Sequence, residues 1–409
     1  MKIHKSYRII SYLNRRHSKF TRYLFGIIGW IAILIITRSI VIANLIFREF
    51  VGDNYLLAMR LSLWIINRFS KRFSLIKDEF YDFTTGTSIK HREAFHKFLA
   101  RVRQGGNMEE YLVDCLYISA ANLHENIELS QSNCSTSNQL ESFFDQADEL
   151  LSLVRPIETK KENVAERQFD FSVDVAAVAL QDFADELDVD KWPWYVISGT
   201  LLGLHREGDF LKHDYDIDIG INSNDIILEE FVCQLKSLNS FVVKKIDCHL
   251  EVMKDGGKGY YMKKTPSLVK IVHCSGMHID VFLHHHEKST YWHGSVIHRW
   301  ENSPFELERR LLRGVVVNAP KDADLYLTEN YGNWKTPIVD FECTTGTPNL
   351  VISRNLLSIS LFIKKLIVAS HASRSEYDKL KEMLVNCEVV ESIDDGLKFV
   401  RGFVTSDRP

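Results

Sequence analysis

Apolar and polar positions alternate most strictly at the end of one stretch, WYVISGTLLGLHREGDFLKHDYDIDIGI, which covers residues 194–221. An apolar run breaks at 198–200, SGT, and a polar loop leads into a run in which isoleucines separate aspartates. Such alternation is typical of a strand with one face on the core. In an extended strand Asp214, Asp216 and Asp218 would point to the same side, because side chains two residues apart share a face. The alternative is that these acids belong to a solvated loop or strand edge.

The rest of the chain divides into segments with different patterns. Apolar residues spaced at three and four predict helices between 76 and 190, in EAFHKFLARV, EEYLVDCLYISAANLHENIEL, ESFFDQADELLSLV and VDVAAVALQDFADELDV. Beyond the acidic strand, DIILEEFVCQLKSL predicts a helix, and FVVKKI, HLEVMK and GYYMKK predict short strands around Gly256 and Gly257. The run HIDVF predicts another apolar strand, which carries Asp280. We therefore expect an α+β protein with a mixed β-sheet flanked by helices at 191–350, preceded by a helical region at 76–190 and followed by a helical tail at 351–409.

The first 75 residues predict a basic, hydrophobic, α-helical segment at a membrane. Residues 24–47 include 18 apolar residues out of 24, and as a helix they would be about 36 Å long, enough to cross a hydrocarbon core of about 30 Å. Arg38 interrupts this run, but its insertion cost of about 3 kcal/mol is outweighed by the surrounding Leu, Ile, Val and Phe residues. Residues 55–69 are apolar but contain Arg60 and Arg68, which favours an interfacial or core helix. The alternative is a hydrophobic helical domain without a membrane.

Charge is distributed unevenly, although 409 residues with 45% hydrophobic and 25% charged composition are ordinary for a globular protein of two or three domains. Residues 1–72 contain thirteen Lys or Arg and two acids, which gives +11, and the remaining residues contain 37 against 52, which gives −15. The basic end suits anionic lipid headgroups. The acidic remainder would repel a phosphate backbone, so we expect no nucleic acid partner. Seven scattered cysteines without a C-x-x-C pair argue against a disulfide framework and a structural zinc site.

Carboxylates held side by side repel one another and need a neutralising partner. Mg²⁺ or Mn²⁺ meets this need, because such hard cations bind one or two carboxylates together with the oxygens of a phosphate. Asp280, alone in an apolar strand, would be costly unless it were paired or bound to metal, and that cost disappears if its strand lies beside the strand of Asp216. The SGT turn at a helix start would offer N–H groups to a phosphate, which Arg206 could also contact. The pattern favours phosphoryl or nucleotidyl transfer.

Three runs together resemble the LicD and fukutin family of phosphotransferases: SGTLLGLHREGDFLKHDYDIDIG, HIDVF and PFELERRLLRGVVVNAPKDADLYLTENYGNWKTP, over roughly 190–350. The resemblance implies a nucleotidyltransferase-type fold and transfer of a phospho-alditol or phosphocholine group from a CDP-activated donor to a glycan hydroxyl. It assigns catalytic and metal-binding roles to Asp216, Asp218 and Asp280. We expect the substrate-binding residues to be Ser198, Gly199, Thr200, Arg206 and His278.

This chain departs from the family pattern just before the metal pair. The family often has I-P-W-D-D-D where residues 211–216 are LKHDYD, so Tyr215 replaces an acid and the donor or acceptor pocket is expected to differ. Tyr331 is either a substrate contact or a packing aromatic. A zinc site could be drawn from His284–His286 with His273, His278 and His293. Adjacent histidines on a strand point to opposite faces, however, and cannot chelate one ion without a bend.

These observations predict a membrane-associated enzyme that modifies a capsule, lipopolysaccharide or glycoprotein glycan. We expect it at the cytoplasmic face of a bacterial inner membrane, held there through residues 1–72. The alternative is a single-pass type II membrane protein with a lumenal catalytic domain, where the sequon at Asn133 would matter. The rival functions are a D-x-D metal-dependent glycosyltransferase, of which the SGTLLG turn is not a hallmark, and a non-catalytic membrane scaffold for glycan assembly.

Overall fold

The computed structural model describes residues 108–129, 134–156 and 172–405, apart from short gaps at 213, 256–258, 339–340, 342, 344–345 and 394–395. The membrane segment expected in residues 1–75, the helix expected at 93–102 and the sequon at Asn133 lie outside the described residues. Among the helices that are described, none is both long enough and apolar enough to cross a membrane.

A ten-stranded mixed β-sheet forms the centre of the fold. Its strands are β1 Tyr195–Val196, β2 Ile217–Asn222, β3 Phe241–Lys254, β4 Tyr260–His273, β5 His278–Glu287, β6 Thr290–Gly294, β7 Arg299–Asn302, β8 Leu307–Leu312, β9 Val315–Pro320 and β10 Leu350–Val351. The main path runs β10-β7-β6-β5-β2-β1-β9-β8, and the β3–β4 hairpin joins it through pairing of β4 with β5. A separate two-stranded sheet consists of β11 Val390–Ile393 and β12 Gly396–Phe399.

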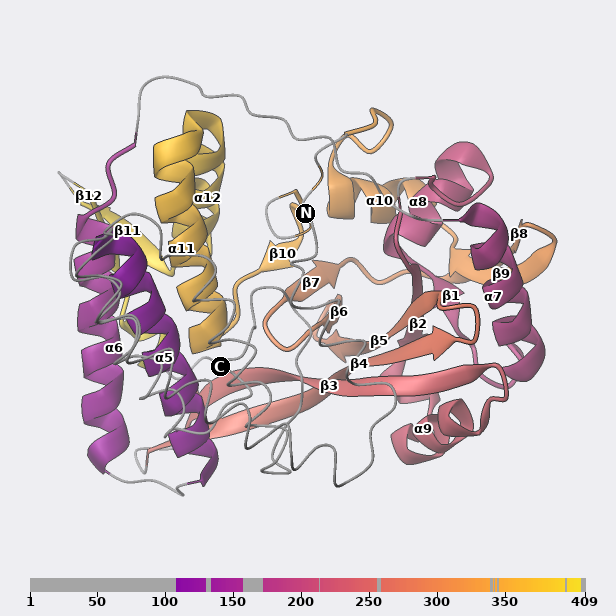
Figure 1. The fold of residues 1–409 in the computed structure, drawn as a ribbon, viewed down its shortest axis with the longest axis horizontal. Coiled ribbons are helices and arrows are strands. Elements are labelled where there is room, and N and C mark those ends of the chain that lie inside the picture. The colour runs from indigo at the N-terminus through magenta and orange to yellow at the C-terminus, as the bar shows by residue number, and fades with distance from the viewer. Residues whose placement is uncertain are drawn as a thin grey trace, which may run out of the picture.

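The helices form two groups at opposite ends of the molecule (Figure 1). They are α5 Met108–Leu129, α6 Cys134–Ser152, α7 Val173–Glu186, α8 Ser198–Glu207, α9 Leu228–Ser237, α10 Ala323–Tyr331, α11 Leu356–Ala372, α12 Arg374–Asn386 and α13 Gly402–Thr405. Figure 1 shows α5, α6, α11 and α12 together at one end of the molecule and α7 to α10 around the sheet at the other. The expected α+β class, a mixed sheet flanked by helices, is confirmed.

Two apolar cores correspond to these two groups. In the first, Ile217, Ile219 and Ile221 of β2 are fully buried in the same cluster as Phe183 of α7 and Phe231 of α9. The isoleucine face predicted by the alternation is therefore a core face. The second core is built from α5, α6, α11, α12, α13 and the β11–β12 sheet. The helices before residue 155 thus share a core with the tail after residue 350, whereas α7, although it precedes residue 191, packs on the sheet.

The β3–β4 hairpin connects the two cores. We expected short strands around Gly256 and Gly257, but β3 and β4 are two continuous strands of 14 residues each. Phe241 and Ile271, near one end of the hairpin, are buried in the sheet core, and Val252, near the other end, is buried in the helical core. Two register shifts in the pairing, which are typical of β-bulges, allow such a long ribbon to twist between its two attachments.

Asn355 ties the hairpin to the helical core. It is fully buried, and its side-chain amide donates to the carbonyl oxygens of Leu250 and Val296, 2.9 Å from each. Its side-chain oxygen accepts from the backbone N–H groups of Leu357 and Ser358 at the start of α11. One side chain therefore caps a helix and holds two other segments of the chain beside it.

We predict that Asn355→Ala lowers the free energy of unfolding by about 3 kcal/mol, because it removes a helix cap and leaves buried polar groups without partners. Ser373→Ala is the matched control: Ser373 also caps a helix, α12, but its hydrogen bond to Glu376 is exposed, so the expected loss is about 1 kcal/mol. Urea unfolding of both variants tests the difference. Equal losses would contradict a role for Asn355 beyond capping.

Candidate functional site

A row of four charged residues crosses the face of the sheet opposite the isoleucines. Asp218 of β2 lies opposite Asp280 of β5 in a parallel pairing, and Lys270 of β4 lies opposite Asp280 in an antiparallel pairing. Lys245 of β3 lies opposite Lys270. Directly paired residues on neighbouring strands project from the same face. The strand of Asp280 therefore lies beside the acidic strand, as the cost of a lone buried carboxylate suggested.

The strand begins later than the alternation predicted. β2 starts at Ile217, so Asp214 and Asp216 precede it and only Asp218 lies within it. The expectation that all three acids share one strand face is wrong. The Asp214 backbone N–H donates to the Leu211 carbonyl, and its side chain accepts from the Tyr215 N–H. Such local hydrogen bonds of an Asp side chain favour a turn over an extended strand.

The acids are nevertheless close enough to repel one another. Burial raises the pKa of Asp216, and the charges of Asp218, Asp280 and Asp214 raise it further. Burial likewise raises the pKa of Asp218, with Asp214 and Asp280 adding to the effect. The site therefore holds more negative charge than its protein neighbours compensate.

The start of α8 is bonded directly to this cluster. Ser198 begins the helix with a positive φ of 49°, and the N–H of Gly199 donates to Oδ2 of Asp218 at 3.3 Å. The buried Thr200 hydroxyl accepts from the Asp218 N–H at 2.9 Å. A Cβ on Gly199 would lie 2.5 Å from Oδ2 of Asp214, so only glycine allows that carboxylate to come so close. The predicted SGT turn thus lies beside the acids, and two of its polar groups contact Asp218.

Sequence reasoning missed Lys270. Its ammonium lies 2.5 Å from Oδ2 of Asp280, whose side chain is only 7% exposed. Burial alone would lower the pKa of Lys270, but the Asp280 carboxylate and its hydrogen bond, helped by Asp216, raise it above its ordinary range. A single lysine inside the apolar run SLVKIV was the available signal, because a charge in such a strand needs a buried partner.

A second ion pair lies next to the first. Lys245 and Asp247 of β3 approach to 2.7 Å, and the Asp247 side chain is 5% exposed. Burial raises the pKa of Asp247, and Lys245 opposes that effect. The two lysines are opposite each other in the sheet but bind different carboxylates, so these four charges form two ion pairs beside Asp218 of β2.

The two remaining candidate substrate-binding residues, His278 and Arg206, lie in different parts of the fold. His278 lies two residues before Asp280 on the same strand, with its ring nitrogens 3.4 Å from the ammonium of Lys244. Arg206 lies in the last turn of α8, about 12 Å along the helix from Ser198. Its guanidinium donates to the Trp334 carbonyl and pairs with Glu207. The structure thus places His278 on the strand of Asp280 and beside Lys244, and it does not bring Arg206 to the helix start.

Two tyrosines lie near the acids. Tyr215 is 67% exposed, and the Asp216 carboxylate raises the pKa of its phenol. Burial raises the pKa of Tyr331, with Asp218 contributing, and the Tyr331 ring packs edge-on against Phe341. Tyr331 is therefore both a packing aromatic and a neighbour of the acids.

The consecutive histidines contact different partners. His284 is buried with its ring centroid 4.5 Å from that of His293, whose pKa burial lowers to about 3. His285 stacks on Trp292, and His286 stacks on Tyr291. Within the part of the chain that the structure describes, no three His, Cys, Asp or Glu side chains are arranged so that they could hold one metal ion. Neither the histidines nor the aspartates among the described residues form such a group of three, and Asp280 is directed to Lys270.

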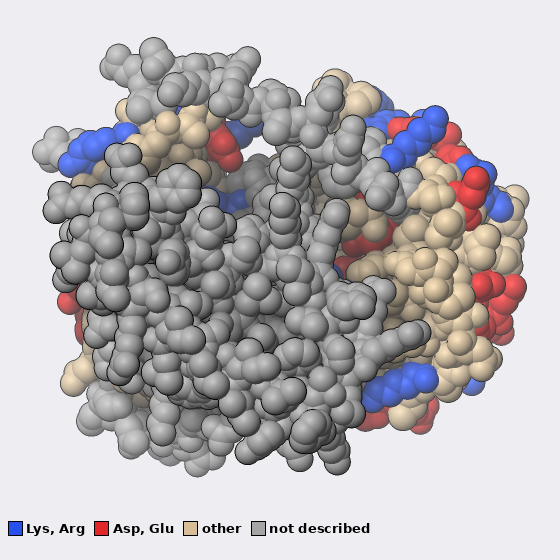
Figure 2. Space-filling view, viewed as in Figure 1, with Lys and Arg blue, Asp and Glu red and all other residues tan. Residues whose placement is uncertain are grey.

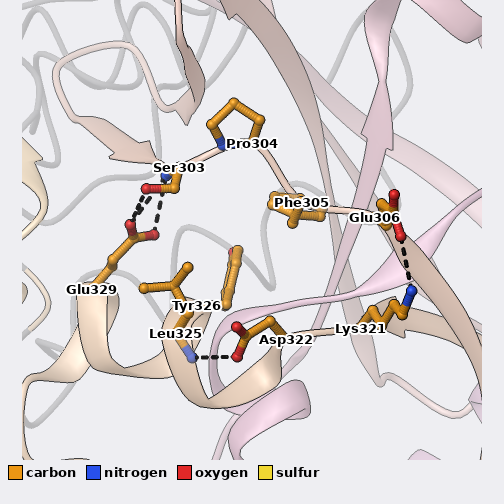
Figure 3. Close-up of a pocket in the computed structure, with 9 residues that line it drawn as sticks. All are labelled: Ser303, Pro304, Phe305, Glu306, Lys321, Asp322, Leu325, Tyr326 and Glu329. Carbon is orange, nitrogen blue, oxygen red and sulfur yellow. Dashed lines mark hydrogen bonds and ion pairs between the residues drawn. The ribbon is translucent and has the colours of Figure 1, made fainter.

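A pocket of about 400 Å³ lies between the β7–β8 connection and α10. Its lining includes none of the predicted site residues (Figure 3). Glu329 accepts from the Ser303 backbone and hydroxyl, and Lys321 pairs with Glu306. Tyr326 connects this pocket with the acids, since burial and then the Asp218 charge raise the pKa of its phenol. The pocket is therefore a neighbour of the site rather than its centre.

Part of the chain matches a known protein family. Residues 191–322 match a family model described as LicD/FKTN/FKRP, nucleotidyltransferase domain. The matched region runs from before β1 to the end of β9 and includes the three acids and Lys270. No curated protein is similar enough to the chain to count as a relative.

We predict that Asp216→Asn raises the free energy of unfolding at pH 7 by about 1 kcal/mol in EDTA, because it removes one of the repelling carboxylates. The pKa of Asp216 is raised above its unfolded value of about 4, so the folded state retains a proton that the unfolded state loses. Stability without metal therefore falls as the pH rises from about 4 towards the raised pKa.

Urea unfolding in EDTA at pH 4 and pH 7 tests this, with Glu230→Gln on the exposed start of α9 as the control. The gain from Asp216→Asn should be present at pH 7 and small at pH 4. A variant less stable than the unmodified chain at pH 7 would show that the acids do not repel one another as inferred.

Proposed function

Because residues 191–322 match a family model described as LicD/FKTN/FKRP, nucleotidyltransferase domain, we propose that the chain is a metal-dependent phosphotransferase. It would move a phospho-alditol or phosphocholine group from a CDP-activated donor to a glycan hydroxyl. The observation that carries this proposal is the pairing of Asp218 with Asp280 across β2 and β5, with Asp216 beside them and the start of α8 in contact. Acids gathered in this way suit a reaction in which phosphate charge must be neutralised and aligned.

The donor set fits Mg²⁺ or Mn²⁺. The described groups around the site are the carboxylates of Asp214, Asp216, Asp218, Asp247 and Asp280 and the ammonium groups of Lys245 and Lys270. Five carboxylates against two ammonium groups leave an excess of negative charge. In our proposal Asp216 and Asp218 hold the ion and Asp280 is the third acid of the site. The bound ion would supply neutralisation of the donor phosphates.

The residues of the chain have separate tasks in the reaction. The acceptor hydroxyl oxygen bonds to the β-phosphorus of the donor, the bond from that phosphorus to the bridging oxygen breaks, and CMP leaves. Asp280 accepts the hydroxyl proton on Oδ1, because its Oδ2 is paired with Lys270. In our proposal Ser198, at the start of α8, and His278, two residues before Asp280 on β5, donate to phosphate oxygens.

The partners and location that we propose follow from the sequence. Residues 1–72 would bind anionic lipid and hold the enzyme at the cytoplasmic face of a bacterial inner membrane, where nucleotide-activated donors are available. The glycan would belong to capsule or lipopolysaccharide. On the described part of the face in Figure 2, Lys and Arg side chains lie among Asp and Glu side chains, a distribution unlike the basic stripe of a nucleic acid binder.

We predict that Asp216→Asn and Asp218→Asn each lower CMP release from a CDP donor at least about a hundredfold, because each removes a ligand of the ion that neutralises the donor phosphates. Far-UV circular dichroism should remain unchanged. Asp209→Asn is the matched control: Asp209 lies on the same loop but pairs with Arg313. Undiminished CMP release by either site variant would refute the proposed metal pair.

A donor panel separates the proposal from its rivals. CDP-alditols and CDP-choline should release CMP in the presence of a glycan acceptor, and UDP-sugars should release no UDP. The reverse result would identify a glycosyltransferase. The absence of turnover with every donor would favour a scaffold.

A further inference from the structure

Asp280, the third acid of the site, is already paired with the ammonium group of Lys270. Asp280 lies opposite Asp218 in register, but its Oδ2 is directed to Lys270, 2.5 Å away. The side chain of Asp280 is 7% exposed and that of Lys270 is 29% exposed, so the pair is largely shielded from water. Removing one partner of such a pair is costly, because it leaves an uncompensated buried charge.

The sheet fixes this pairing. Lys270 is directly opposite Asp280 on β4, so the short contact requires no movement of the backbone. The neighbouring lysine in the row, Lys245, does not compete for Asp280, because it is held 2.7 Å from Asp247 on its own strand. Asp216 and Asp218 have no comparable ammonium contact among the described residues, and Asp218 instead accepts from the Gly199 N–H.

We propose that Lys270 is a positioning residue that withholds Asp280 from the metal, so that the ion is held by two aspartates and keeps its other positions open. This inference rests on the proposed metal pair and deepens it. Mg²⁺ sites that work on phosphates use one or two carboxylates and leave the remaining positions to water and substrate oxygens. With Lys270 in place, Asp280 faces the same space as the ion but does not bind it.

Tight binding of the metal and access of the donor phosphate to the metal therefore oppose each other. A third carboxylate on the ion would bind it more tightly, since ligand charge is a main determinant of divalent cation affinity. It would also occupy a position that a donor phosphate oxygen needs. Lys270 therefore weakens metal binding in the free protein and preserves room for the donor.

The test is a Mn²⁺ titration of the purified full-length chain, in which the signal of free Mn²⁺ in electron paramagnetic resonance measures binding without any turnover. We expect Lys270→Met to bind Mn²⁺ at least about tenfold more tightly than the unmodified chain, because Asp280 becomes a third ligand. In the double variant Lys270→Met with Asp280→Asn, the gain should disappear.

Lys245→Met is the matched control. Lys245 is opposite Lys270, carries the same charge and also pairs with a buried aspartate, so its loss reproduces the change in net charge without freeing Asp280. Its Mn²⁺ affinity should stay within about threefold of the unmodified chain, because charge acts more weakly at a distance than a direct ligand does. Lys270→Leu repeats the test with another apolar side chain, in case the Met variant does not fold.

Three results would overturn the inference: no gain in affinity on loss of Lys270, a gain that survives Asp280→Asn, or an equal gain in Lys245→Met. Asp216→Asn and Asp218→Asn distinguish this from failure of the proposed function. If both bind Mn²⁺ as the unmodified chain does, the metal pair itself is misplaced. If they lose binding while Lys270→Met gains nothing, only the role of Lys270 is refuted.

Discussion

The register between β2 and β5 is the constraint on which the site depends. Asp218 lies opposite Asp280 only because Ile217 pairs with Ile279 and Ile219 with Val281, and these apolar side chains are fully buried on the other face. A slip of one residue would move every one of these side chains to the opposite face. Burial contributes about 1.5–3 kcal/mol for each such side chain, so the apolar face determines the register and the acids are brought together as a result.

The repulsion that this register creates is reduced by close contacts from two sides. The start of α8 supplies the Gly199 N–H to Asp218, and β4 supplies the Lys270 ammonium to Asp280. Two glycines leave room for side chains to pack closely around these contacts. Gly199 leaves room for Asp214, and Gly220 leaves room for the rings of Tyr195 and His284, to which a Cβ would come as close as 2.4 and 2.9 Å. The site is therefore held by the sheet and the helix together, and not by a loop alone.

The β3–β4 hairpin links the site to the distant helical core. Lys245 and Lys270 lie near the end of the hairpin that packs on the sheet core, while Val252 lies in the core shared by α5, α6 and α11. Asn355 bonds the same part of β3 to the start of α11. The segments that flank the matched region 191–322 in sequence thus stabilise the strands that carry Lys245 and Lys270.

The sequence alone determined the local features: the buried isoleucine face of β2, the helix that starts at Ser198 and the apolar strand around Asp280. It also determined the resemblance of roughly 190–350 to the LicD and fukutin family. Each depends on a periodicity or a motif within a few residues. Only the tertiary structure decided that β2 begins at Ile217, that Arg206 turns to Trp334, that Lys270 binds Asp280, and that helices from both ends of the described chain share one core. Periodicity shows which face of an element is buried but does not show which element covers it. The partner of a buried charge is fixed by the pairing of strands, which brings together residues that are separated in the sequence.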